Sequence, residues 1–159
     1  MIGIRRASVK DLDAINDLTV EMHNHLGALV GIKFSIEELK EEMYEAEEGL
    51  ENTYVAESDG RVVGYMTFSR NVEENEFFGK YYHLYHIVVN REFRGKGIAA
   101  KLFNMLQRKA KLENVNIVCG TLCLNEEALK FYQRMGFKPI QTTLIIDNLK
   151  RLKPLNREA

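Results

Sequence analysis

The stretch HLYHIVVNREFRGKGIAAKLFNMLQRKA, His83 to Ala110, joins two regular patterns through charged and flexible residues. An apolar, β-branched run comes first, a helical pattern comes last, and Arg94-Gly95-Lys96-Gly97 lies between them. A helix N-terminus presents unpaired backbone N–H groups and partial positive charge, and glycine lets a ligand approach the backbone closely. The joint is therefore suited to bind a pyrophosphate. An ordinary turn with solvated basic residues is the alternative interpretation.

The joint differs from two common phosphate-binding motifs. Lys96 is followed by Gly97 rather than by Ser or Thr, so the P-loop pattern is not met, and the spacing is not GxGxxG. A nucleotide-phosphate binder of those classes is therefore disfavoured.

Ten elements are predicted to position the joint. Ser8 with Asp11 begins a helix that Gly27 and Gly31 break, and Ser35 with Glu38 begins a second helix. The second helix carries an apolar stripe of Ile36, Leu39, Met43 and Leu50. Strands are expected at 2–7, 53–58, 61–70, 81–89, 116–124 and 140–147, with Asp59-Gly60 as a hairpin turn and a polar loop at 71–80. Further helices are expected from 98 and from 125, and a basic tail follows the last strand. The helix from 98 has an apolar stripe of Ile98, Leu102, Phe103, Leu106 and Ala110. The order β-α-α-β-β-β-α-β-α-β predicts an α/β (mixed α+β) fold, a central mixed sheet flanked by helices, in one domain over 1–159.

The composition limits the partners and the cellular location that can be expected. The 159 residues carry a formal net charge of −1, which gives no overall indication of nucleic-acid binding. The chain shows no apolar run long enough to span a membrane and no secretory leader, so a cytoplasmic location is expected. Cys119 and Cys123 lie in an apolar run and are expected to be reduced and buried.

Two motifs together resemble a known family. Arg94 to Ala99 matches Arg/Gln-x-x-Gly-x-Gly/Ala after an apolar strand, and LNEEALKFYQRMGFKPI ends in Phe-Tyr-x-x-x-Gly-Phe. In this order and spacing they resemble the GNAT superfamily of acetyl-coenzyme A-dependent N-acetyltransferases. The resemblance is strong from Tyr54 to Ile140 and weak from Met1 to Asn52, where members differ by acceptor.

The resemblance implies roles for particular residues. The coenzyme A pyrophosphate is expected on the turn, and the pantetheine arm is expected beside the preceding strand, in a gap where two strands part. A backbone N–H at Val88 or Val89 would polarise the thioester carbonyl. Asn125 would contact the arm, and Tyr132 would protonate the leaving thiolate. The implied cofactor-binding residues are Ile87, Val88, Val89, Arg94, Gly95, Lys96, Gly97, Ile98, Ala99, Ala100 and Asn125.

Other interpretations stay open for the second motif and for the glutamate-rich segment. Tyr132 also suits a core aromatic, and Asn125 caps a helix in either case. Residues 36–52 hold eight glutamates against one lysine, which fits a solvated helix face or attraction of a cationic acceptor.

An amine acceptor must lose a proton before it attacks, and histidine suits that task. Strand alternation places His83 with Ile87 and Val89 and places His86 on the other face, although a bulge would break the alternation. His83 is the predicted base, with a structural or water-relayed role as the alternative, and His86 is expected under a helix. His23 and His25 end the first helix, and the histidines are too scattered for zinc, so no metal is expected.

The predicted function is acetyl transfer from acetyl-coenzyme A directly to a primary amine, in a ternary complex. The acceptor is expected to be a small amine, a polyamine or a peptide amine, with no nucleic-acid or membrane partner and with a possible homodimer. A non-catalytic acyl-coenzyme A sensor or interaction module is the alternative. Such a module would keep the joint but would not need His83 or Tyr132.

Overall fold

A computed structural model describes residues 1–44 and 47–154, without the side chains of residues 47 and 48. The chain forms two compact units. The first unit contains Met1–Val20 and Glu42–Gly120, and the second contains Glu21–Glu41 and Thr121–Ala159. Helix α1 (Leu12–Val30) begins in the first unit and ends in the second.

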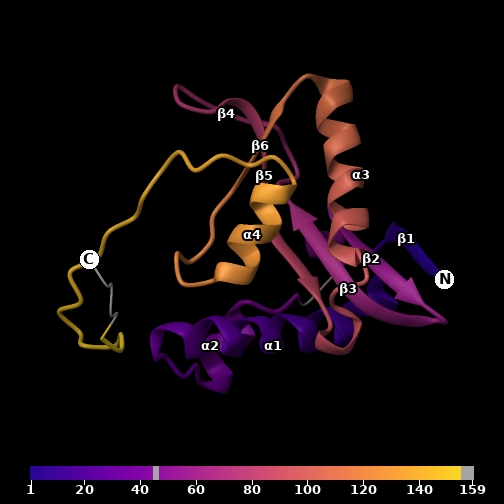
Figure 1. The fold of residues 1–159 in the computed structure, drawn as a ribbon. Helices are drawn as coiled ribbons and strands as arrows, with labels where there is room; N and C mark the ends of the chain where they lie inside the picture. The colour runs from indigo at the N-terminus through magenta and orange to yellow at the C-terminus, as the bar shows by residue number, and fades with distance from the viewer. Residues whose placement is uncertain (45–46, 155–159) are drawn as a thin grey trace. The chain divides into compact units, whose positions relative to one another are not determined.

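The first unit is built on a six-stranded sheet (Figure 1). Its strands are β1 (Ile2–Arg6), β2 (Thr53–Ser58), β3 (Arg61–Phe68), β4 (Glu73–Asn75), β5 (Gly79–Val89) and β6 (Asn116–Cys119). All pairs are antiparallel except β5 with β6, which is parallel. Tyr81 of β5 pairs with Glu73 of β4 and also with Asn116 of β6. Since a strand has two edges, β4 lies along the same edge of β5 as β3, and β6 lies along the other.

The sheet begins with the predicted hairpin. Asp59 and Gly60 join β2 to β3 with φ angles of 50° and 78°, which are left-handed conformations that Asp and Gly tolerate. Val63, Tyr65 and Met66 of β3 are fully buried. The central position of β3, between β2 and β5, explains this burial.

Helix α3 (Ile98–Glu113) connects β5 to β6 and packs against the sheet. A short 3₁₀ turn, Arg91–Phe93, precedes it. The apolar stripe expected from the sequence is the buried face of α3: Ile98, Leu102, Phe103, Leu106 and Ala110. Asn114 ends the helix in a left-handed conformation, so the chain turns directly into β6.

The second unit contains two short helices, α2 (Ile36–Glu41) and α4 (Glu126–Arg134). The predicted capping box of α2 is present, because Ser35 N–H donates to Glu38 and Glu38 N–H donates to the Ser35 hydroxyl, at 2.8 and 3.2 Å. Asn125 caps α4 by accepting from the Ala128 N–H at 3.3 Å, as predicted. Gly136, with φ of 96°, follows its end.

The mixed α+β fold class is confirmed, but several details of the prediction are wrong, and the predicted strand 116–124 ends at Cys119. First, 140–147 is not a strand, and its Leu144 and Ile146 side chains are 82% and 86% exposed. The segment contains the β-branched Ile and Thr residues that favour a strand, but no strand in the described part of the chain pairs with it. Second, the polar loop contains β4, because β4 pairs with the start of β5.

Third, the helices have other ends than expected. Gly27 does not break α1, which continues to Val30 and ends at Gly31, where φ is 81°. The predicted stripe from Ile36 to Leu50 is not one helix, because α2 ends at Glu41 and Leu50 lies in a 3₁₀ turn at Glu47–Leu50. The glutamate-rich segment includes residues 45 and 46, and the basic tail includes 155–157, all outside the described residues.

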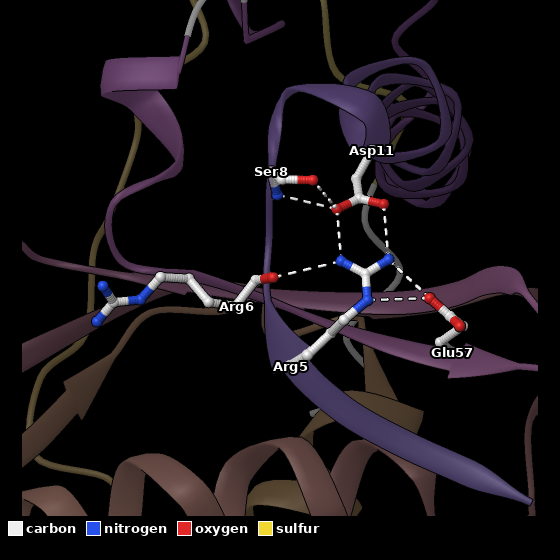
Figure 2. A network of polar contacts seen from close by, with 5 residues as sticks. All are labelled: Arg5, Arg6, Ser8, Asp11 and Glu57. Atoms are coloured by element: carbon white, nitrogen blue, oxygen red, sulfur yellow. Dashed lines mark hydrogen bonds and ion pairs between the residues drawn. The ribbon is translucent and has the colours of Figure 1, made fainter.

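Arg5 ties β1, β2 and the turn before α1 together (Figure 2). Its guanidinium donates to both Asp11 carboxylate oxygens at 2.7 and 2.9 Å and to Glu57 at 2.7 and 2.9 Å. Asp11 also accepts from Ser8 N–H at 2.9 Å and is almost fully buried. The hydrogen bonds from Arg5, followed by those from Ser8, lower the pKa of Asp11 from 3.8 to about 2.

Asp11→Asn should lower the free energy of unfolding by about 2 kcal/mol at pH 7. Because the folded state lowers the pKa, this stabilisation is present above pH ~4 and is lost as pH falls toward ~2. Denaturant unfolding of both proteins at pH 7 and pH 2 checks this, with exposed Asp13→Asn as control. An equal difference between wild type and Asp11→Asn at both pH values would contradict the role of the Asp11 charge.

Candidate functional site

Strand β5 contains a bulge that resets which side chains share a face. Thr67 of β3 pairs with His86, but the next residue, Phe68, pairs with Leu84, so Tyr85 is the extra residue. Residues directly opposite each other in neighbouring strands lie on one face of the sheet. His86 therefore lies on the Thr67 face and Leu84 on the Phe68 face. His83, next to Leu84, lies on the Thr67 face as well, so both histidines share one face. The sequence-based expectation of opposite faces holds only without the bulge.

The hydrogen-bond pattern fixes the direction of the backbone groups of β5. Asn90 N–H donates to Val63 of β3 at 2.8 Å. Hydrogen-bonded and non-hydrogen-bonded pairs alternate along an antiparallel ladder, so Val88 also directs its N–H and C=O toward β3. Ile87 and Val89 direct theirs to the opposite edge. Of the two amides considered for the oxyanion contact, only that of Val89 points away from β3.

Strand β6 pairs with only part of this outward edge of β5. The parallel ladder with β6 runs from Tyr81 and Asn116 to Leu84 and Cys119 and stops there. Within residues 1–44 and 47–154, no strand pairs with the outward edge beyond Leu84. The outward backbone groups of Ile87 and Val89 thus lie beyond the end of the β5–β6 ladder, where the gap between two strands is predicted.

Hydrogen bonds and cation–π contacts stabilise the turn after β5. Arg94 Nε donates to the Val89 carbonyl at 3.1 Å, and Asn90 accepts from the Glu92 N–H at 2.9 Å. The Phe93 ring lies beneath two cations, with Lys96 Nζ at 4.8 Å and the Arg61 guanidinium carbon at 5.7 Å from its centroid. The turn therefore has a defined conformation in this structure.

Two glycines shape the end of the turn. Gly95 and Gly97 both have φ of 76°, a left-handed conformation that other residues adopt only at a cost. No atom lies within 4 Å of the position of a Cβ at either glycine, so the backbone there is open to a ligand. Gly97 caps α3, whose first turn contains no acidic residue. The unpaired N–H groups of Ile98, Ala99 and Ala100 thus begin a helix with Arg94 and Lys96 nearby in sequence.

His83 lies on the Thr67 face of β5, among polar and aromatic groups. Its ring stacks on Tyr85 with centroids 4.7 Å apart, and its Nδ1 lies 3.9 Å from a carboxylate oxygen of Glu73. The side chain is 38% exposed. Its backbone binds Ser69 in both directions, at 2.8 and 3.0 Å. A role as base stays a prediction; the Glu73 contact was not foreseen, because β4 was expected to be loop.

His86 is half-buried and lies at the head of a buried hydrogen-bond chain. Its Nδ1 is 3.2 Å from the Tyr65 hydroxyl, which is 2.8 Å from the Thr19 hydroxyl of α1. Thr19 donates to the Ile15 carbonyl at 2.8 Å. Burial raises the pKa of Tyr65 well above its ordinary value, so the phenol stays protonated. Sequence reasoning missed Tyr65 and Thr19, because nothing in their local spacing links residues 46 positions apart.

Tyr132 and Asn125 belong to the second unit. The Tyr132 ring lies 5.5 Å from Phe131 and 5.3 Å from Phe137, edge to face, and all three rings are half-buried. Asn125 is a helix cap, as described above. Neither observation decides between a structural and a catalytic role for these residues, and both roles stay predictions.

The two cysteines have different surroundings. Cys119 is half-buried, and burial raises the pKa of its thiol to about 11; Cys123 is exposed, so the expectation of two buried thiols is wrong. The strand expected to bury both thiols ends at Cys119.

The described part of the chain contains neither a metal-binding cluster nor a membrane-spanning helix. No group of three or more His, Cys, Asp or Glu side chains is arranged there to hold a metal ion. No helix there is long and apolar enough to cross a membrane.

A pocket of about 500 Å³ lies at the ends of β1 and β3. It contains none of the residues predicted for the site, and it is lined by Arg6, Ala7, Leu50, Glu51, Asn52, Arg70 and Asn71. The bare edge of β5 and the glycine turn are therefore the better candidates for the site.

Curated proteins similar to this chain include N-acetyltransferases. The chain is 35% identical over 86 residues to rat N-acetylaspartate synthetase, an alignment covering 54% of this chain and 27% of the relative. It is 37% identical over 87 residues to an uncharacterized N-acetyltransferase of Methanocaldococcus jannaschii, covering 54% and 51%. The chain thus matches between a quarter and a half of the length of these relatives.

Solved structures share the fold. The PaiA N-acetyltransferase of Thermoplasma acidophilum, in complex with coenzyme A, has a TM-score of 0.71 at 19% identity, over 90% of this chain and 93% of that one. Aminoglycoside N-acetyltransferase AAC(6′)-Iy, in complex with coenzyme A, has a TM-score of 0.68 at 19% identity, over 93% and 95%.

The family model described as the acetyltransferase (GNAT) family matches residues 14–137, which include β5, the glycine turn and the second motif. The fold agrees with this match, and the chain belongs to the GNAT acetyltransferase family.

Proposed function

We propose that the protein binds acetyl-coenzyme A and transfers its acetyl group directly to a primary amine. One observation carries the proposal: the edge of β5 that has no strand partner is followed, after the 3₁₀ turn Arg91–Phe93, by the glycine turn at the start of α3. A ligand for this surface needs amide groups at one end, to pair with a strand, and phosphate at the other. Coenzyme A has both, because its pantetheine arm contains two amides and continues into a pyrophosphate.

The proposed binding mode assigns a task to each part. The pyrophosphate accepts hydrogen bonds from backbone N–H groups between Gly95 and Ala100, with Lys96 supplying charge. The pantetheine arm pairs with the outward groups of Ile87 and with the Val89 N–H, as an added strand would, while the Val89 carbonyl accepts from Arg94. An outward amide of this edge donates to the thioester oxygen and stabilises the negative charge that develops on it.

The reaction needs three proton transfers. The acceptor ammonium gives a proton to a base, and the neutral nitrogen then attacks the thioester carbon. As the C–S bond breaks, the sulfur takes a proton, for which we propose the phenol of Tyr132. The nitrogen loses its second proton as the amide forms, and this proton, passed through solvent, restores the phenol. His83 is the base favoured by sequence reasoning, and His86 shares its face of β5.

Direct transfer is favoured over an acetyl-enzyme at Cys119. The thiol pKa of Cys119, in the first unit, is raised by burial to about 11, so very little reactive thiolate exists there at neutral pH.

The acceptor is proposed as a primary amine without further restriction. The relatives carry different acceptors in their names, such as the N-acetylaspartate synthetases and the aminoglycoside acetyltransferase. The proposed function is tested by thiol release from acetyl-coenzyme A with a panel of amino acids, polyamines, aminoglycosides and peptides. Amine-dependent release supports it. Tight coenzyme A binding without release for any amine would favour the acyl-coenzyme A sensor instead.

Gly97→Val should weaken coenzyme A binding about tenfold or more. A β-branched residue at φ of 76° costs on the order of 1–3 kcal/mol, and its side chain also occupies the open space above the turn. Lys96→Ala should weaken binding less, since it removes charge but leaves the backbone unchanged. Titration calorimetry with coenzyme A measures both effects.

Gly60→Val is the matched control. Gly60 has φ of 78° and equally open surroundings, but it lies in the β2–β3 hairpin. The Gly60→Val protein should lose about as much folding stability as Gly97→Val and keep its affinity for coenzyme A. Equal affinity of folded Gly97→Val and wild type would remove the turn from the binding site.

Tyr132→Phe should lower kcat about 10²-fold, the low end for loss of a general acid, with little change in coenzyme A affinity. The substitution keeps the ring that packs against Phe131 and Phe137. Tyr54→Phe, which also removes one phenol, serves as control. If kcat is unchanged while chemistry limits the rate, Tyr132 is only a packing residue.

A further inference from the structure

We infer that His86, rather than His83, accepts the proton of the acceptor amine, and that Tyr65 and Thr19 are positioning residues that hold its imidazole in one tautomer. The inference rests on the proposed acetyl transfer and deepens it. It begins from the buried chain that runs from His86 through Tyr65 and Thr19 to the Ile15 carbonyl.

The direction of this chain follows from counting hydrogens. A carbonyl only accepts, so the single hydroxyl hydrogen of Thr19 is given to Ile15. Thr19 must then accept from Tyr65, which uses the only hydrogen of that phenol. The Tyr65 oxygen is left to accept, so Nδ1 of His86 carries a hydrogen. Neutral His86 is therefore the Nδ1–H tautomer, and its basic lone pair is on Nε2.

The opposite tautomer would break the chain. If Nδ1 carried the lone pair, Tyr65 would donate to it, and Thr19 would have to turn its hydrogen from Ile15 to Tyr65. The Ile15 carbonyl would keep its backbone hydrogen bond within α1 but lose the Thr19 hydroxyl, in a region where Tyr65 and Thr19 are 0% and 1% exposed. The opposite tautomer therefore has one buried hydrogen bond fewer, and the packing favours the Nδ1–H form.

The same arrangement suits a group that gains and loses a proton. When Nε2 takes a proton from the ammonium, the N–H bond of the amine breaks, a new N–H bond forms at Nε2, and the nitrogen keeps its electron pair for attack on the thioester. Nδ1–H still donates to Tyr65, so the chain need not rearrange. The imidazolium formed makes a stronger hydrogen bond to the phenol oxygen than the neutral ring does.

Position also favours His86 over His83. His86 directly precedes Ile87, whose backbone faces the gap beyond the end of the β5–β6 ladder. His83 lies where β5 still pairs with β6, opposite Val118, and its ring rests on Tyr85 beside Glu73. The buried edge-to-face contact of His86 with Tyr65, at 6.2 Å between centroids, holds its ring in place.

The tautomer is measured first, because it does not depend on catalysis. Two-bond ¹⁵N–¹H correlation spectra of protein labelled at histidine nitrogens distinguish a protonated nitrogen from one with a lone pair. At a pH where His86 is neutral, its Nδ1 should be protonated and its Nε2 should not. In Tyr65→Phe this preference should be lost. A wild-type His86 found as the Nε2–H tautomer would overturn the inference.

Kinetics then test the role of the ring, at saturating acetyl-coenzyme A with one amine that the wild type acetylates. His86→Ala should lower kcat by about 10² or more, and Tyr65→Phe by roughly tenfold, each with KM for acetyl-coenzyme A unchanged. Tyr82→Phe is the matched control, because Tyr82 is a buried tyrosine of the opposite face that donates to Glu113 of α3. It should lose stability and keep kcat.

His83→Ala completes the comparison. A large loss of kcat in His83→Ala, with His86→Ala unaffected, would overturn the inference and make His83 the base. A wild type that releases thiol with no amine would contradict the proposed function itself, while the tautomer spectrum would still report on the chain. A variant that fails to fold is replaced by Thr19→Val, which breaks the same chain one bond farther from His86 and should also reduce the Nδ1–H preference.

Discussion

The end of the β5–β6 ladder at Leu84 and Cys119 is the constraint on which the proposed site depends. Backbone N–H and C=O groups need partners, and a strand edge that loses its neighbour offers them to something else. Here the groups without a strand partner are those of Ile87 and the Val89 N–H, and the chain then passes the 3₁₀ turn Arg91–Phe93 and enters a turn shaped by two left-handed glycines. The edge thus offers strand pairing, and the turn that follows it along the chain offers anion binding. That combination is what a coenzyme A molecule requires.

The bulge at Tyr85 determines which face of β5 its two histidines occupy. By inserting one residue, it brings His83 and His86 to the same face of β5 and still leaves Ile87 and Val89 directed at the gap. One histidine then rests on an exposed tyrosine beside Glu73, and the other on a buried phenol. His83 and His86 therefore have different surroundings. Only His86 contacts the buried hydrogen-bond chain, on which its inferred role as base rests.

Local signals in the sequence predicted much of this structure. The buried stripe of α3, the Asp59-Gly60 hairpin and the caps at Ser35 and Asn125 each depend on neighbouring residues, and each is confirmed. The failures depend on distant partners. Residues 140–147 have the β-branched composition of a strand but have no strand partner in the described part of the chain, and β4 is a strand only because β5 pairs with it. The bulge, and with it the shared face of His83 and His86, also depends on the register with β3.

The central claim, that coenzyme A pairs with the outward edge of β5, is tested most directly by amide hydrogen exchange, residue by residue, with and without coenzyme A. Without ligand, the Ile87 and Val89 amides should exchange faster than that of Val88, which faces β3. Coenzyme A should slow exchange at Ile87 or Val89 and at the amides of Gly97 to Ala100, and leave Val88 nearly unchanged. Binding of coenzyme A without added protection at Ile87 or Val89 would contradict the claim.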